Sequence, residues 1–417
     1  MNERDAVAWL HRRAGFGLPP DELRAAAARG PQAELDRLLD PDGAGAPATH
    51  DLWDDEQLPL DPRDREARLH AVLRWLELIS TTEQPLVDRV AWLWHGHFVS
   101  SLDKVRVARL LVNQVRLFRA VGLGGFRDLL HDITLDPAML IYLDLRDSNR
   151  IVPNENYSRE LLELFTLGEG NYTEADVQAG AAALTGWTLR RGGAPGGGVR
   201  FVEAAHDGSQ QTYLGATGVH DLDTVLDAVM GHDAMPGFIA ATFASELLGS
   251  TDDDLVTALA GEFVAAGFDV RALVRATLQA GLDGAAAPLV LGPVPWFGIA
   301  GRVTGAAVAP RTVLRLLRGT GQLPLLPPNV AGWPGGTAWF AASSLVARSN
   351  LAAALAGATP AGEVLAAAAG DDLAVLADVL GLPAEGFGTD SSAALAATPA
   401  GRDRLAVALI TPEFMIA

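Results

Sequence analysis

The chain has 417 residues, 49% of them hydrophobic, a formal net charge of −19 at pH 7 and no cysteine. A nucleic-acid-binding protein gathers Lys and Arg on one face to release counterions, so this acidity excludes nucleic acid as an expected partner. The lack of cysteine excludes disulfides, thiolate metal sites and a cysteine nucleophile.

Alanine and leucine supply most of the apolar residues, and both rank high in helix propensity. The sequence therefore predicts a mainly α protein, a large multi-helical domain that carries a Gly-rich loop or short hairpin insertion. No segment has the pattern of a signal peptide, and no apolar run of ~20 residues is free of Pro and Gly. We therefore expect a cytoplasmic protein without a membrane span.

Three regions are predicted along the chain. Residues 1–62 should form an N-terminal helical arm. Residues 63–350 should form a helical core, because apolar residues recur there at three- and four-residue steps. A loop excursion rich in glycine interrupts this core at 190–215. Residues 351–417 are Ala-rich and should add C-terminal helices packed on the core.

Local signals mark several helix ends within the core. Asp136-Pro137 predicts a helix start, since Asp caps the free N–H groups and Pro suits the first turn. A second helix is predicted from Asn154 to about Gly168. Thr173 then opens another helix, with Asp176 placed three residues later as in a capping box.

The densest polar pattern lies between Asn154 and Glu163. A helix there places Glu155, Arg159 and Glu163 at four-residue steps on one face, with Glu160 on a neighbouring strip. Such a face could hold a metal ion or supply an acid of raised pKa beside an ionised base. It could equally be a solvated Glu-Arg-Glu ladder of ion pairs.

Histidines supply two further candidates. Trp94-His95-Gly96-His97-Phe98 ends a predicted helix, and His97 is the histidine of this motif that we predict to point into a site as a metal ligand. Five His-Asp dipeptides occur, of which His206-Asp207 in the Gly-rich excursion ranks first. The alternatives are a buried histidine bonded to a carbonyl and, for the other dipeptides, helix caps and surface residues.

These motifs together resemble the bacterial domain of unknown function 1800 (DUF1800) family, over about residues 6 to 350. The resemblance implies a helical bacterial protein and no defined activity. The family usually has Asn where this chain has Gly96, and Lys after the His-Asp-Gly element, where this chain has Ser209-Gln210-Gln211. The motifs are His11-Arg12-Arg13-Ala14-Gly15-Phe16-Gly17, the Trp94 to Phe98 segment, Asn154 to Gly168, Tyr172 to Val177, Leu184-Thr185-Gly186-Trp187, His206-Asp207-Gly208, Gly332-Trp333-Pro334 and Trp339.

The first functional hypothesis is a metal-dependent hydrolase in which the motif residues converge. His97, Glu160 and His206 would be ligands of Zn, Fe or Mn, which would activate a water. Glu163 or Asp207 would act as a further ligand or base. Arg159 would orient a carboxylate or a substrate anion.

Two alternatives remain open at this point. A metal-free acid/base enzyme acting on glycans would use Glu155 with Glu160 or Glu163 as its pair of carboxyl groups. A non-catalytic structural or partner-binding protein would instead bury the Asn154 helix in satisfied hydrogen bonds. The substrate of either enzyme would be an unidentified small molecule or glycan.

Overall fold

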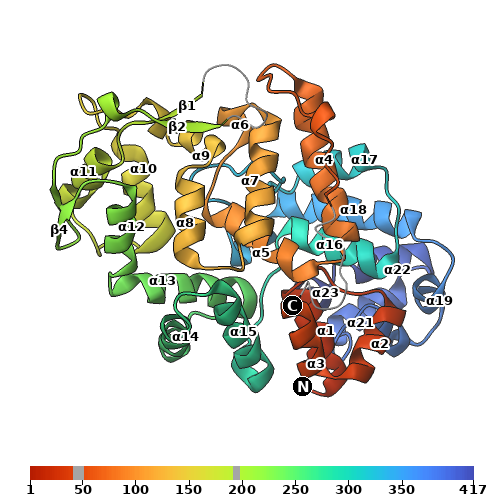
Figure 1. The fold of residues 1–417 in the computed structure, drawn as a ribbon. Helices are drawn as coiled ribbons and strands as arrows, with labels where there is room; N and C mark the ends of the chain where they lie inside the picture. Colours follow the sequence, from red (N-terminus) through yellow and green to blue (C-terminus); the bar gives the residue numbers. More distant parts are fainter. Residues whose placement is uncertain (41–50, 191–197) are drawn as a thin grey trace.

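Capping side chains such as Asn2, Asp64 and Asp136 set several helix starts in the first third of the chain. Figure 1 shows where these helices lie. The computed structural model describes residues 1–40, 51–190 and 198–417. Asp136 accepts the Met139 N–H and Pro137 occupies the first turn of its helix, as predicted. The elements of this part are α1 (Glu3–Arg13), α2 (Pro20–Arg29), α3 (Pro31–Leu39), η1 (Asp55–Gln57), α4 (Arg65–Thr81), α5 (Pro85–His97), α6 (Leu102–Val105), α7 (Ala108–Val121), α8 (Phe126–Thr134), α9 (Pro137–Tyr142) and η2 (Leu145–Asp147).

The middle of the chain contains the predicted polar helix and the Gly-rich excursion. The capping box of Thr173 and Asp176 is confirmed. The excursion forms two short antiparallel hairpins, with 191–197 outside the described residues. The elements are α10 (Glu155–Glu160), the π-helix η3 (Leu161–Thr166), α11 (Glu174–Ala183), β1 (Trp187–Leu189), β2 (Val199–Phe201), η4 (Glu203–Ala205), β3 (Gln211–Tyr213) and β4 (Ala216–Val219).

Helices return after the second hairpin and continue to the C-terminus. The predicted boundary between 350 and 351 falls inside one of them, α18. The elements are α12 (Leu222–Met230), α13 (Ala234–Phe243), the π-helix η5 (Ala244–Leu248), α14 (Asp253–Ala265), α15 (Val270–Ala280), η6 (Gly281–Ala285), α16 (Pro293–Thr304), α17 (Pro310–Arg318), η7 (Gly336–Phe340), α18 (Ala342–Ala358), α19 (Glu363–Ala369), α20 (Leu373–Val379), α21 (Thr389–Ala397), α22 (Arg402–Ala408) and α23 (Pro412–Met415). The mainly α fold class is therefore confirmed.

The buried apolar residues form two large clusters. One joins α1 and α3 to α8 and to helices α10–α15. The other joins α4 to α16 and the C-terminal helices α17–α23. Residues of α5, α7 and α9 belong to both clusters, so these helices form the shared wall between the two halves (Figure 1).

Among the described residues, no single helix has both the length and the apolarity needed to cross a bilayer. Only α18 and α19 taken together pass such a test, and their axes are bent by 111°.

Candidate functional site

Buried contacts fix the orientation of the Asn154 helix. Tyr157 is fully buried, and its hydroxyl lies 2.6 Å from Thr134 Oγ1. Ser158 donates to the Val177 carbonyl on α11 at 2.8 Å. Gly180 of α11 permits this contact, since a Cβ there would lie 2.4 Å from Ser158 Oγ. These anchors hold the polar face of α10 in one position.

Glu155 and Arg159 belong to a surface ion-pair network. Arg159 lies 3.3 Å from the Glu155 carboxylate and binds Glu174 of α11 through two nitrogens, at 2.7 and 2.8 Å. The Glu174 side chain is 69% exposed, and ion pairs of this kind contribute ~0–1 kcal/mol. Neither Glu155 nor Arg159 lines the cavity that contains Glu160, so the ladder interpretation fits these two residues.

Glu160 stands where α-helical geometry gives way to a π turn. The Thr166 hydroxyl donates to the Leu161 carbonyl five residues earlier and closes this wider turn. Single π turns inside α-helices are frequent at functional sites. Burial raises the pKa of Glu160 above its usual value, and the negative charge of Glu163 adds to this effect. Glu163 itself accepts a hydrogen bond from Tyr172 at 2.7 Å.

Glu160 lines a cavity of about 460 Å³, which we call the Glu160 pocket. Its walls come from the α10 motif, from the segments around α6 and α9, and from the Pro-rich loop before η7. A volume of this size lies within the ~300–1,000 Å³ typical of small-molecule sites. The lining residues are Ser101, Asp103, Lys104, Tyr142, Leu143, Asn156, Glu160, Pro327, Pro328 and Val330.

Lys104 and Asp144 are parts of this site that sequence reasoning missed. Lys104 Nζ lies 2.7 Å from the Asp144 carboxylate and 5.9 Å from the centre of the Tyr142 ring. Two motif amides reach the same aspartate: Asn154 Nδ2 lies 3.4 Å from its carbonyl and Asn156 Nδ2 lies 3.5 Å from its carboxylate. A signal was present, because Lys104 is the single lysine of the chain.

His97 connects the Trp-His motif to the π turn. Its Nε2 donates to the Phe165 carbonyl at 2.9 Å, so Nδ1 carries the lone pair of the neutral ring. Burial lowers the pKa of His97 to about 4, and the imidazole is neutral at pH 7. A carbonyl that orients one ring nitrogen is common to structural histidines and to metal ligands, and does not distinguish them.

The Trp-His and Gly-Trp-Pro motifs meet at a second, smaller cavity of about 260 Å³. Trp333 stacks on Trp92 with ring centres 5.0 Å apart and planes at 11°. Gly332 lies so close that an added Cβ would be 2.5 Å from the Gly96 carbonyl. These two motifs are therefore a packing contact that joins α5 to the Pro-rich loop.

The His206-Asp207 pair belongs to a different part of the molecule. His206 Nδ1 donates to the Thr185 carbonyl at 3.0 Å, and the Asp207 N–H donates to the Thr185 hydroxyl at 2.7 Å. The Asp207 carboxylate accepts the hydroxyl and N–H of Ser209, and these hydrogen bonds lower its pKa. The pair thus closes a turn against the Leu184 to Trp187 motif.

The predicted convergence of the polar motifs on a metal ion stays a prediction. In residues 1–40, 51–190 and 198–417, no group of three or more His, Asp or Glu side chains is arranged to hold a metal ion. His97 bonds to the Phe165 carbonyl and His206 to the Thr185 carbonyl, and Glu160 lines a different cavity from His97. The binding of zinc, iron or manganese by these residues stays a prediction.

The first motif, His11-Arg12-Arg13, is buried and structural. His11 Nε2 lies 2.9 Å from Glu34, which is fully buried. Burial alone would raise the pKa of Glu34, but hydrogen bonds from His11 and two arginines outweigh it and hold the pKa at about 2. Arg12 donates to the Phe414 carbonyl at 2.8 Å, and Arg13 to the Leu247 carbonyl at 3.1 Å.

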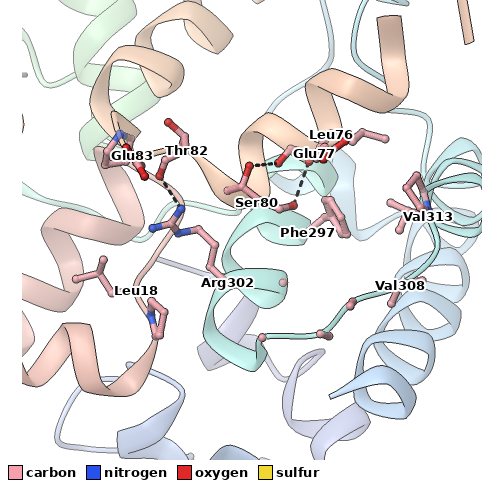
Figure 2. Close-up of a pocket in the computed structure, with 18 of the residues that line it drawn as sticks. Leu18, Leu76, Glu77, Ser80, Thr82, Glu83, Phe297, Arg302, Val308 and Val313 are labelled. Carbon is pink, nitrogen blue, oxygen red and sulfur yellow. Dashed lines mark hydrogen bonds between the residues drawn. The ribbon is translucent and has the colours of Figure 1, made fainter. Parts of the chain in front are cut away.

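A larger cavity, of about 800 Å³, lies between α4, α16 and the segment after α1 (Figure 2). Its wall combines apolar side chains such as Phe297 with carboxylates such as Glu83. Arg302 donates to the carbonyls of Thr82 and Gly17, at 2.9 and 3.2 Å, and so ties these segments together. None of the predicted site residues lines this cavity.

The fold and these motifs define a mainly α protein whose α10 motif lines the Glu160 pocket. Over residues 9–416 the chain matches the family described as "Protein of unknown function (DUF1800)", and it belongs to that family. No curated protein and no solved structure matches it.

Proposed function

We propose that the chain is an enzyme that performs metal-independent acid/base chemistry in the Glu160 pocket, with Glu160 as the proton donor. The supporting observation is a half-buried carboxyl group of raised pKa that lines a pocket with other polar side chains. Carboxyl groups of this kind remain protonated nearer to neutral pH, as a general acid requires.

A glycan or another polyhydroxylated compound is the substrate class that the pocket fits best. The amide of Asn156 can bond to substrate hydroxyls, and the Tyr142 ring and Pro328 offer apolar surface. Sugars present both kinds of surface, polar edges and apolar faces. The negative charge of Glu163 adds to the rise in the pKa of Glu160.

The test is a panel of polysaccharides and chromogenic glycosides with release of reducing ends as the readout. Glu160→Gln should lower activity about 10²–10⁴-fold, the usual contribution of a general acid. Glu155→Gln, four residues earlier on the same helix but in the ion-pair network, should retain activity. Full activity in Glu160→Gln contradicts the proposal, as does activity that a chelator abolishes and added zinc restores.

A second candidate is a partner-binding role for the turn that precedes the motif. Ile151 and Val152 are 81% and 67% exposed, which is unusual for adjacent large apolar residues. If they contact a protein partner, Ile151→Ser with Val152→Ser should abolish its binding while activity in the glycan panel is unchanged.

A further inference from the structure

The chain uses arginine at 31 positions and lysine at one, Lys104. Among the described residues, Lys104 is also the only cationic side chain that lines the Glu160 pocket. A lysine placed at random among the 32 cationic positions would reach this pocket about once in 32. The choice of lysine here therefore calls for a chemical reason.

The contacts of Lys104 do not supply that reason. Its ammonium pairs with Asp144 at 2.7 Å and lies over the Tyr142 ring at 5.9 Å. Arginine makes both contacts at least as well, because its planar guanidinium binds carboxylates in a bidentate manner and stacks on aromatic rings. What arginine cannot do is lose a proton and attack a carbon atom, whereas a primary amine can.

The residues around Lys104 hold a carboxylate, that of Asp144, next to its amine. Asp144 has a left-handed backbone conformation, φ 59° and ψ 18°, which few residues other than Gly, Asn and Asp adopt. The amides of Asn154 and Asn156 reach it from the motif helix, at 3.4 and 3.5 Å. The carboxylate is thus held beside the ammonium, and the lysine side chain is 45% exposed.

We propose that Lys104 is a nucleophilic amine that forms an imine with an aldehyde or ketone substrate, an inference that rests on the proposed role of Glu160 as proton donor. Asp144 accepts a proton from the Lys104 ammonium, and the amine forms a bond to the carbonyl carbon. The carbonyl π electrons move to oxygen, and a proton passes from the newly bonded nitrogen to this oxygen to give a neutral carbinolamine. Glu160 then protonates this hydroxyl, which leaves as water while the nitrogen lone pair forms the C=N bond.

The balance closes without a further reactant. One carbonyl compound and one lysine ammonium give one protonated imine and one water, and no atom is oxidised or reduced. Asp144 then releases its proton to solvent, and Glu160 takes up a proton from solvent. The substrate class is narrowed to polyhydroxylated aldehydes and ketones, such as open-chain sugars, because the pocket also presents the Asn156 amide.

Only two primary amines in this chain can be labelled, the α-amino group and Lys104. We would treat the folded protein with glyceraldehyde and cyanoborohydride at pH 7 and quantify both amines by peptide mass spectrometry. An ordinary lysine of pKa ~10.4 offers a few hundred times less free amine at this pH than an α-amino group of pKa ~8. The α-amino group is therefore an internal reference.

We expect Lys104 to be labelled at least as fast as the α-amino group. Asp144→Asn and Glu160→Gln should each slow Lys104 labelling at least tenfold without changing labelling of the α-amino group, and Glu155→Gln should change neither. Lys104→Arg confirms the assignment by removing the internal label. Circular dichroism of each variant checks that it is folded.

The inference is overturned if Lys104 in the folded protein reacts as slowly, relative to the α-amino group, as it does in urea. That result combined with loss of glycan activity in Glu160→Gln leaves the proposed function standing. Fast labelling of Lys104 that Glu160→Gln does not slow overturns instead the assignment of Glu160 as the proton donor.

Discussion

Single buried groups in this protein carry charge states that differ from those of the unfolded chain. His95 is fully buried among Trp75, Trp92 and Trp333, and burial lowers its pKa from 6.5 to about 3. Its Nε2 accepts the Leu325 N–H at 3.2 Å, so the ring must stay neutral to keep this bond. Asp136 shows the opposite case, because burial raises its pKa to about 7.

The shift of His95 predicts a loss of stability in acid. As the pH falls from about 6.5 towards 4, the unfolded chain gains a proton on His95 that the folded chain does not, so the free energy of unfolding decreases. His95→Gln keeps an acceptor for Leu325 and removes the titration. Urea unfolding at pH 7.0 and 4.5 should give a decrease larger in the wild type by about 2 kcal/mol. Equal decreases in both proteins would contradict the prediction.

Asp136 should give the folded protein the opposite pH dependence of stability, and Asp136→Asn should remove it. The folded chain binds a proton on Asp136 between about pH 4 and 7 that the unfolded chain has released, so the wild type loses stability as the pH rises through this window. Asparagine keeps the oxygen that accepts from Met139 and Gln114. The melting temperature of the variant relative to the wild type should therefore increase from pH 5 to pH 8. A constant difference would show that Asp136 is ionised throughout.

At the scale of elements, the contact between α5 and the Pro-rich loop depends on glycine. Gly332 has φ +80°, and an added Cβ would lie 2.5 Å from the Gly96 carbonyl. Gly321 has nearly the same conformation, φ +84°, with open space around it. Alanine substitutions at the two positions therefore separate two effects. Both force alanine into a left-handed conformation, but only the one at Gly332 also brings a Cβ against the Gly96 carbonyl.

Gly321→Ala should cost about 1 kcal/mol of unfolding free energy, the price of a left-handed alanine. Gly332→Ala should cost about 2–4 kcal/mol, because the loop must also move away from α5. The near-ultraviolet circular dichroism of the stacked Trp92 and Trp333 should decrease only in Gly332→Ala. If the two substitutions lower the unfolding free energy by similar amounts, the close approach to Gly96 does not explain why glycine is needed at position 332.

Elements with local signals could be predicted from the sequence, and contacts between distant segments could not. The start at Asp136-Pro137 and the capping box of Thr173 follow from neighbouring residues. The π turn after Glu160 is invisible to such reasoning, since its residues have an ordinary helical pattern.

The candidate site was predicted only in part, for the same reason. Glu160 was included because it stands on the motif helix. The sequence suggests a functional role for Arg159 because the pattern of one helix does not reveal its main partner. That partner, Glu174, lies on the next helix. Lys104 and Tyr142 enter the pocket only through the packing of α6 and α9 beside α10, which no local pattern encodes.

At the scale of the whole molecule, two buried arginines of α1 join the hydrophobic halves to the C-terminal segment. Arg13 is 1% exposed and donates to the Leu247 and Ala287 carbonyls, at 3.1 and 2.6 Å, and also to the Ala417 carbonyl. Arg12 donates to the Phe414 carbonyl at 2.8 Å. Removal of a buried donor leaves carbonyls without partners, at ~1–3 kcal/mol for each.

Arg13→Gln should therefore lower the free energy of unfolding by at least ~2 kcal/mol. Arg24→Gln is the matched control, since Arg24 also links the N-terminal helices to the C-terminal ones, through Glu363 at 2.7 Å, but both side chains are about half exposed. Its effect should stay below about 1 kcal/mol. Comparable losses in guanidinium unfolding would contradict a structural role specific to the first motif.

The hydrogen bonds of Arg12 and Arg13 to the C-terminal segment also constrain how the chain folds during its synthesis. The hydrogen bonds of Arg12 and Arg13 to residues 416 and 417 span 404 positions of the chain. Translation at about 5–20 residues per second places roughly 20–80 s between emergence of the two partners from the ribosome. During that time the two guanidinium groups lack these C-terminal carbonyl partners, whereas the apolar face of α1 can already pack on α2 and α3, so the link to residues 416 and 417 forms only late in synthesis.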